Sequence, residues 1–302
     1  MFVAPLSGRP SVSRSIASGF VRKYLIQTLV LAIALGSLSA SAALRAESPA
    51  PSRPIRSEKD VVYCEVDGRK LYADIYRPDD NQNYPGVLMI HGGAWTSGDK
   101  WNMSDHAREL AQAGYVAVAI NYRLAPSFKF PAQIDDCRAA LRWVGEVADQ
   151  YKIDKQRLGV YGYSAGGHLA ALLATDPTAG LPELSAAVAG GAPCDLTFIP
   201  ADSRAIAHVM GGTRNEYPLL YRDASPLTYA SKDDCPIFFF HGDKDLIVPP
   251  TASRVLCNRL NDLGVETCYY AVEKQGHLVT FIHPDARRAA IEFLNKHLQQ
   301  AD

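Results

Sequence analysis

The sequence lacks the short motifs by which proteins commonly hold metals, phosphates and dinucleotides. It has no C-x-x-C pair, no H-E-x-x-H zinc pattern, no G-x-x-x-x-G-K phosphate loop and no G-x-G-x-x-G after its first expected strand. Each of these motifs places ligand groups or glycines at the spacing that the chemistry requires. We therefore expect neither a metal nor a cofactor.

An excess of charge of either sign is also missing. The 302 residues carry 31 Lys and Arg against 32 Asp and Glu, which gives a formal net charge of −1, and they form no basic cluster. Nucleic acid and anionic lipid surfaces recruit proteins through such clusters, so neither is an expected partner. With 47% hydrophobic and 21% charged residues, the composition is that of a folded globular protein.

The N-terminal region has the features of an export signal. An apolar stretch over residues 24–38 is followed by the small-residue cleavage site Ala40-Ser41-Ala42, and the only charges before it are Arg9, Arg14, Arg22 and Lys23. This pattern predicts a signal peptide over residues 1–42 and a secreted or periplasmic protein. The alternatives are an uncleaved membrane anchor and a true start downstream of Met1.

Polar residues argue against a stable membrane span. Ser, Gln and Thr interrupt the apolar stretch, so it only marginally reaches the about 20 apolar residues that a span requires. We expect no membrane span once the signal is removed. Residues 43–60, which contain three prolines and no apolar periodicity, are interpreted as a linker, so that a single domain covers residues 61–302.

Cysteine is neither absent nor arranged in a diagnostic pattern. The six cysteines are an even number in a chain expected to leave the reducing cytosol, so disulfides are permitted. They are not required, because a domain of about 240 residues buries enough surface to fold without them. The spacing does not define a pairing.

The apolar pattern predicts a mostly parallel sheet that opens with an antiparallel hairpin. Residues 61–66 and 70–76 flank Asp67-Gly68, a dipeptide suited to a tight hairpin turn. Short apolar runs of the buried parallel type follow at 87–90, 116–120, 158–161, 186–189, 237–240 and 267–271. Helical patterns separate most of them, at 105–113, 134–148, 168–174, 251–263 and 285–298. The fold class is therefore α/β, with eight strands and helices on both faces.

One long connection interrupts this alternation. About residues 192–235 contain several prolines, aromatic residues and only short helical patterns. A connection of this length is usually an inserted lid or disordered, and the apolar content favours an ordered lid.

The strongest chemical signal is Gly162-Tyr163-Ser164-Ala165-Gly166, between an expected strand and an expected helix. Such a turn is so sharp that small residues must flank the serine, whose hydroxyl is left exposed above the sheet. The alternative is a glycine-rich turn without chemistry. The strand–turn–helix context favours Ser164 as a nucleophile.

A serine nucleophile needs a base, and the base needs a carboxylate that orients it. After the run at 237–240, the loop offers Asp243 and Asp245, and we predict Asp245 as the acid because the loop has then cleared the strand. Asp243 is interpreted as a loop residue that caps backbone N–H groups. His277 follows the run at 267–271 and a glycine, which predicts it as the base.

The other seven histidines have plainer interpretations. His91 and His241 end strands and are expected to fix loops by hydrogen bonds, and His168 lies one turn past the serine. Two, His106 and His208, are expected on surface helical segments. His283 stands beside a proline and His297 on the terminal helix.

A second glycine-rich stretch predicts an oxyanion hole. His91-Gly92-Gly93-Ala94-Trp95 follows the run at 87–90, and its Gly93 and Ala94 N–H groups, with that of Ala165, are expected to stabilise a negative oxygen. A merely flexible turn is the alternative, and its pairing with the serine turn disfavours it.

These motifs resemble those of carboxylesterases of the α/β-hydrolase superfamily, similar to hormone-sensitive-lipase-like and bacterial feruloyl-esterase-like enzymes. The resemblance covers about residues 61–298 and extends to Asn121-Tyr122-Arg123-Leu124-Ala125-Pro126, Phe130-Pro131-Ala132 and residues 135–144. Two departures, Ala94 in place of a third glycine and the missing N-terminal cap, favour the feruloyl-esterase-like branch. The resemblance implies an α/β-hydrolase fold without a cofactor.

The sequence thus predicts hydrolysis of carboxylic esters with short or aromatic acyl groups, as small molecules or linked to polysaccharide. Trp95, Trp101, Tyr163 and Phe198 are candidate pocket walls, although such aromatics are as often part of the core. Two alternatives are an amide-cleaving relative such as an arylformamidase and a non-catalytic binding module of the same fold. The second is disfavoured because the serine, acid and histidine positions are all occupied.

Overall fold

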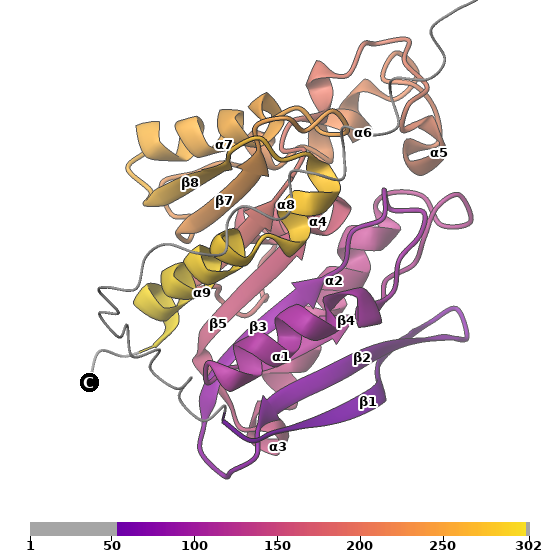
Figure 1. Cartoon of the computed structure of the whole chain (residues 1–302). Coiled ribbons are helices and arrows are strands. Elements are labelled where there is room, and N and C mark those ends of the chain that lie inside the picture. The colour runs from indigo at the N-terminus through magenta and orange to yellow at the C-terminus, as the bar shows by residue number, and fades with distance from the viewer. Residues whose placement is uncertain (1–52, 300–302) are drawn as a thin grey trace, which may run out of the picture. The chain divides into compact units, whose positions relative to one another are not determined.

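The computed structural model describes residues 53–299, which carry one eight-stranded sheet with helices on both faces (Figure 1). The predicted signal peptide at 1–42 and most of the predicted linker lie outside the described residues. The strand order is β1-β2-β4-β3-β5-β6-β7-β8. The strands are β1 (Ile55–Val66), β2 (Arg69–Pro78), β3 (Tyr84–Ile90), β4 (Val116–Ile120), β5 (Ile153–Tyr163), β6 (Ala186–Gly190), β7 (Ile237–Gly242) and β8 (Thr267–Val272).

The sheet has the predicted mixture of strand directions. β1 pairs antiparallel with β2, and β2 pairs antiparallel with β4. All the other neighbours are parallel. Asp67 and Gly68 join β1 to β2 with φ angles of 52° and 73°, the positive values that a tight hairpin turn requires. The predicted fold class is confirmed.

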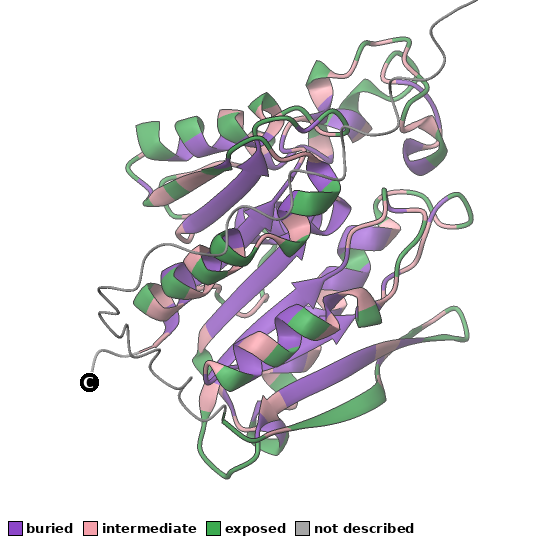
Figure 2. Cartoon of the chain, viewed as in Figure 1, coloured by how far each residue is buried: buried purple, intermediate pink, exposed green. Residues whose placement is uncertain are grey.

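Helices cover both faces because the central strands are apolar on both sides (Figure 2). One core lies between the sheet and α2 (Ala132–Glu146), α4 (Ala165–Ala174) and α7 (Thr251–Asp262). The other core lies under α1 (Ser104–Gln112) and α9 (Pro284–Leu298). Short helices complete the set: η1 (Lys100–Met103), α3 (Ala148–Tyr151) and α8 (His277–Ile282). None of the helices in residues 53–299 is long and apolar enough to cross a bilayer.

The domain begins earlier than the sequence suggested. The predicted linker ended at residue 60, but β1 starts at Ile55, which pairs with Pro78, and Ser57 pairs with Tyr76. Residues 56–60 are exposed at the edge of the sheet, so an apolar alternation is not required there. The linker prediction was wrong for these residues because the pattern carried no strand signal.

The 192–235 connection consists of short helices. These are η2 (Leu196–Phe198), α5 (Ala207–Met210), α6 (Pro218–Asp223) and η3 (Pro226–Thr228). His168 Nε2 on α4 lies 2.7 Å from the Ala224 carbonyl oxygen, and the Phe130 N–H donates to the Val209 carbonyl at 2.9 Å. The segment is therefore tied to α4 and to the loop after β4. A lid function for it stays a prediction.

The six cysteines are unpaired in the described part of the chain. Three of them, Cys137, Cys194 and Cys257, are buried, where cysteine acts as a small hydrophobic residue. The disulfides that the sequence permitted are not formed in this structure.

Candidate active site

Ser164 lies in a strained turn between β5 and α4. Its φ and ψ are 57° and −121°, a conformation that is costly for a residue with a side chain and that is held by the surrounding structure. A Cβ at Gly162 would lie 2.0 Å from the Gly166 oxygen, and a Cβ at Gly166 would lie 2.0 Å from the Ile90 oxygen. Only glycine fits at both flanks, so the expected strand–turn–helix geometry is present.

His277 lies within hydrogen-bonding distance of this serine. Its Nε2 is 2.8 Å from Ser164 Oγ, although 113 positions separate the two residues along the chain. The sequence placed His277 in a loop, but it is the first residue of α8. The α8 helix has only six residues and follows Gly276, which is why the sequence pattern did not reveal it.

Asp245 contacts the second ring nitrogen of His277. Its Oδ2 lies 2.5 Å from His277 Nδ1, and its Oδ1 accepts the N–H groups of Ile247 and Val248, each at 2.9 Å. Both Asp245 and His277 are buried, so water competes little with these bonds. Asp243 has a partly exposed side chain and contributes a backbone N–H to the Val272 carbonyl. Of the two loop carboxylates, the structure therefore brings Asp245 to the histidine.

Tyr163 contacts the backbone of His277. Its hydroxyl donates a hydrogen bond to the His277 carbonyl oxygen, and its ring packs against Phe240 and Phe281. Burial raises the pKa of the Tyr163 phenol, so it stays a donor. The side chain of Tyr163, a candidate pocket wall, belongs to the core, and its role as a wall stays a prediction.

The predicted oxyanion loop lies directly against the serine turn. A Cβ at Gly92 would lie 2.8 Å from the Tyr163 oxygen and 3.2 Å from Ser164 Cβ. Gly93 and Ala94 have φ angles of 120° and 52°, so the chain turns sharply here. Within residues 53–299, the N–H groups of Gly93, Ala94 and Ala165 have no protein acceptor. These three groups are available to a ligand oxygen.

A neighbouring loop fixes this oxyanion loop, and sequence reasoning assigned it no role. The Tyr122 hydroxyl donates to the His91 carbonyl at 3.0 Å, and the Ala125 N–H donates to the Trp95 carbonyl at 2.9 Å. Arg123 binds Asp136 through Nε and Nη2, with contacts of 2.7 to 3.0 Å. The stretch from Asn121 to Pro126, singled out only by resemblance, is thus the support of the candidate oxyanion hole.

The other three candidate wall residues differ in how far they are exposed. Trp95 is buried and donates from Nε1 to His168 Nδ1 at 3.3 Å. It borders a narrow apolar hollow with about 10 Å³ of free volume, together with Phe130, His168, Leu196, Ile206, Val209 and Met210. Phe198 and Trp101 are 76% and 64% exposed. The role of those two residues as pocket walls stays a prediction.

Exposed apolar side chains follow both the acid and the base. Leu246 and Ile247 come directly after Asp245 and are 96% and 66% exposed, and Leu278 after His277 is 74% exposed. The Lys244 N–H donates to the Gln275 carbonyl at 3.0 Å, which holds the two segments side by side. We call Leu246, Ile247, Leu278, Val279 and Ile282 the apolar rim.

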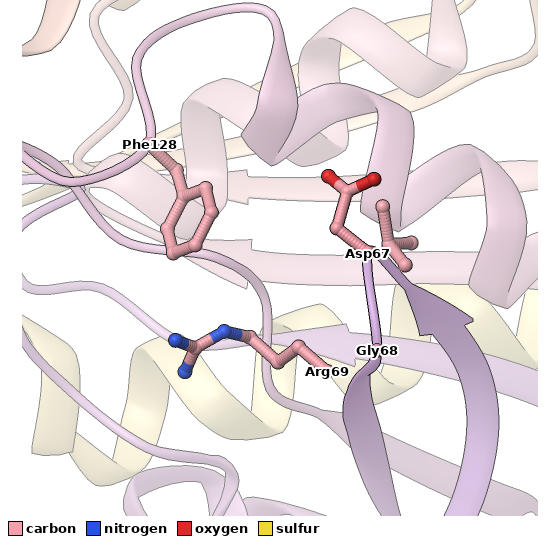
Figure 3. Close-up of a pocket in the computed structure, with 5 residues that line it drawn as sticks. Asp67, Gly68, Arg69 and Phe128 are labelled. Atoms are coloured by element: carbon pink, nitrogen blue, oxygen red, sulfur yellow. The ribbon is translucent and has the colours of Figure 1, made fainter.

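A second hollow lies at the hairpin turn and has a different character (Figure 3). It has a volume of about 390 Å³ and is lined by Val66, Asp67, Gly68, Arg69 and Phe128. The Arg69 guanidinium lies 5.1 Å from the centroid of the Phe128 ring. The residues that line this hollow include no nucleophile beside a base, in contrast to the turn at Ser164.

No group of His, Cys, Asp and Glu side chains within residues 53–299 is arranged to hold a metal ion.

The sheet order and the Ser164 turn are those of the α/β-hydrolase class. A solved structure described as a truncated form of carbohydrate esterase from gut microbiota matches with a TM-score of 0.75 and 26% identity, over 83% of this chain and 99% of that chain. The BD-FAE family profile matches residues 73–260. The chain belongs to the BD-FAE family, which confirms the resemblance drawn from the motifs.

Two curated relatives come from Mycobacterium tuberculosis (strain ATCC 25618 / H37Rv). "Esterase LipQ" is 31% identical over 76% of this chain and 59% of its own length. "Probable carboxylic ester hydrolase LipM" is 32% identical over 75% of this chain and 58% of its own length. The chain therefore spans less than two thirds of these relatives.

Proposed function

We propose that this protein hydrolyses carboxylic esters through a covalent acyl-enzyme on Ser164. The observation that carries the proposal is the line from half-buried Ser164 through buried His277 to buried Asp245, with 2.8 Å from Ser164 Oγ to Nε2 and 2.5 Å between Nδ1 and Asp245. Since a serine hydroxyl is a weak nucleophile at neutral pH, this line supplies the base and its orienting carboxylate. The names of LipQ and LipM, both described as ester-cleaving, support the same activity.

The proposed reaction follows from these positions. As Ser164 Oγ attacks the ester carbonyl carbon, His277 Nε2 takes the hydroxyl proton, and the carbonyl oxygen becomes negative beside the N–H groups of Gly93, Ala94 and Ala165. His277 then gives the proton to the leaving alcohol, which departs and leaves an acyl-serine. Water, deprotonated by His277, cleaves that acyl group and restores the serine. Asp245 keeps the Nδ1–H directed away from Ser164 and stabilises the imidazolium.

We further propose a short or aromatic acyl group on the substrate. The hollow beside Trp95 has about 10 Å³ of free volume, about the room for one water molecule, which disfavours long acyl chains there. The apolar rim offers contact area for an aromatic group. The structural relative described as a carbohydrate esterase supports the proposal that the natural substrates are acetyl or feruloyl groups on polysaccharide.

Action outside the cytoplasm fits this substrate class. Residues 1–42 carry the export pattern of basic residues, apolar stretch and small-residue cleavage site. We propose a secreted or periplasmic location on that sequence pattern alone. Cell fractionation of the tagged full-length chain measures it, and recovery of the unprocessed protein in the cytoplasm would contradict it.

The decisive experiment combines a covalent probe with a substrate series. A fluorescent alkylphosphonate should label the wild type at Ser164, identified by mass spectrometry, and should not label Ser164→Ala. Ser185→Ala, which changes a half-buried serine at the far end of β6, should label like the wild type. Failure of the wild type to react, or reaction at another residue, would overturn the proposal.

Aryl esters from acetyl to long-chain acyl groups then define the preference. We expect acetyl and cinnamoyl-type esters to be cleaved faster than decanoyl esters. Release of acetate or ferulate from xylan tests the polysaccharide substrate. Faster turnover of N-formyl anilides than of acetyl esters would replace the esterase with an amide-cleaving relative.

A further inference from the structure

A second histidine lies against the proposed catalytic acid. His241, near the end of β7, is wholly buried. Its Nε2 is 3.1 Å from Asp245 Oδ2 and 2.9 Å from the Val248 carbonyl oxygen. Its Nδ1 is 2.7 Å from Ser253 Oγ on α7. The proposed reaction uses none of these contacts, although His241 and His277 approach the same carboxylate oxygen.

The neighbours of His241 define its protonation. Both atoms beside Nε2, a carbonyl oxygen and a carboxylate oxygen, only accept hydrogen bonds, so Nε2 carries a proton. Burial is the largest influence on the ring and lowers the pKa of His241. On the other side of the ring, Nδ1 lies within hydrogen-bonding distance of the Ser253 hydroxyl, and this contact orients the ring from the α7 side.

The same imidazole also fixes the turn that carries Asp245. His241 holds the Val248 carbonyl, while the Val248 N–H donates to Asp245 Oδ1 at 2.9 Å. Asp245 Oδ2 then faces the Nδ1–H of His277 and the Nε2–H of His241. A carboxylate surrounded by N–H donors is less basic than one that faces a single donor.

We propose that His241 is a positioning residue for Asp245. It fixes the turn at residues 245–248 and with it the position of the carboxylate that faces His277. The effect on catalysis rests on the proposed function, whereas the effect on the position of Asp245 does not. The titratable groups that face His277 and His241 are Asp245, Tyr163 and each other's imidazole.

The test uses two variants of different chemistry at one position. His241→Leu removes both ring nitrogens. His241→Gln places an amide N–H donor near the position of Nε2 and so keeps the contact with the 245–248 turn. The titration of the His277 ring is followed by NMR, assigned with His277→Gln, and kcat and KM are measured with an aryl acetate. Thermal unfolding shows that both variants are folded.

The two variants should differ in the titration of His277 and in kcat. Without the Nε2–H donor, the 245–248 turn loses one of the contacts that fix it, so in His241→Leu the NMR titration curve of the His277 ring should differ from that of the wild type. In the same variant kcat should fall about tenfold or more with KM within about twofold, because Asp245 no longer holds the imidazole in line with Ser164 and this interaction acts mainly in the transition state. His241→Gln should keep both the titration curve and kcat close to those of the wild type.

A matched control removes an imidazole elsewhere. His297→Leu deletes a largely buried ring that packs on Phe293 of α9, and it should change neither the His277 titration nor kcat. An unchanged His277 titration in folded His241→Leu, or equal effects of Leu and Gln, would overturn the inference. A changed His277 titration in His241→Leu, when the wild type neither reacts with the phosphonate nor hydrolyses esters, would instead overturn the proposed function alone.

Discussion

The Tyr163 hydroxyl and the His277 backbone carbonyl are joined by a hydrogen bond, and the two rings lie 5.1 Å apart between centroids. Tyr163 directly precedes Ser164 in the chain. One side chain therefore ties the helix that begins with the proposed base to the turn that carries the proposed nucleophile. The relative placement of the two reacting groups depends on this bond.

Replacing Tyr163 with Phe should loosen that connection. The variant leaves the His277 carbonyl without its donor, so we expect a loss of about 1 to 3 kcal/mol in the free energy of unfolding, together with a several-fold lower kcat. Denaturant unfolding and aryl acetate turnover measure the two effects. Tyr161→Phe is the matched control, because the Tyr161 hydroxyl is buried without a partner and its removal should be neutral or stabilising. Equal losses in both variants would contradict the role of the Tyr163 bond.

Ile206→Ala should widen the range of acyl groups. Ile206 lines the narrow hollow beside Trp95, and shortening it opens space for additional methylenes. One methylene in such a site changes the specificity constant about 10- to 200-fold, so the ratio of butyryl to acetyl kcat/KM should rise. Ile199→Ala shortens a half-buried side chain of the same segment that does not line this hollow. A ratio that rises equally in both variants would place the acyl group elsewhere.

Asp136→Asn should damage the support of the oxyanion loop. The Asp136 side chain is 1% exposed and pairs with Arg123, and breaking a buried pair from one side costs about 3 to 5 kcal/mol. The variant should lose stability and, where still folded, kcat. Asp135→Asn removes the neighbouring, half-exposed carboxylate that pairs with Arg138, which should cost under about 1 kcal/mol. Chemical unfolding distinguishes the two, and similar losses would argue against the pair as the support.

The stability should depend on pH through His106. Burial and then the nearby Arg287 charge lower the pKa of His106 to about 4. Its Nε2 forms a hydrogen bond with the Phe281 carbonyl oxygen. Protonation would place a hydrogen on the buried Nδ1 as well, and within residues 53–299 no acceptor lies beside that atom. The unfolded chain, with a histidine pKa of about 6.5, binds more protons than the folded chain between the two values.

This contribution is complete above pH 6.5 and is lost as the pH falls through about 4. It amounts to about 3 kcal/mol for the shift involved. In His106→Leu, the slope of the free energy of unfolding against pH in this window should be reduced, whatever the absolute stability. His208→Ala, which removes an exposed imidazole, should keep the wild-type slope. An unchanged slope in His106→Leu would refute the assignment.

Local chemistry decided which parts could be predicted from the sequence. The Ser164 turn needs glycine at two contacts, and the parallel strands need apolar residues on both faces, so both left clear patterns. Asp245 and His277 were found because each follows a strand that ends at the same edge of the sheet. Their catalytic roles remain the proposal stated above.

The remaining features depend on packing between distant segments. Residues 55–60 form an edge strand without apolar alternation. The sequence placed His106 at the surface, but it is buried because Phe281 from α8 stacks on it at 4.4 Å. Tyr163 is covered by that same residue, whereas nothing near Phe198 covers its ring. The burial of His106 and Tyr163 is set by Phe281, more than 100 positions further along the chain, and the edge strand is set by its pairing with β2. A linear pattern contains neither kind of contact.

The first residues of β1 carry charged side chains along one edge of the sheet. An edge strand has unpaired backbone N–H and C=O groups to which a strand of another chain can add. Charged side chains on the edge commonly prevent this addition. Here Arg56, Glu58 and Lys59 are exposed along the terminal strand of the sheet. These charges disfavour the addition of a strand from another copy of the chain along that edge.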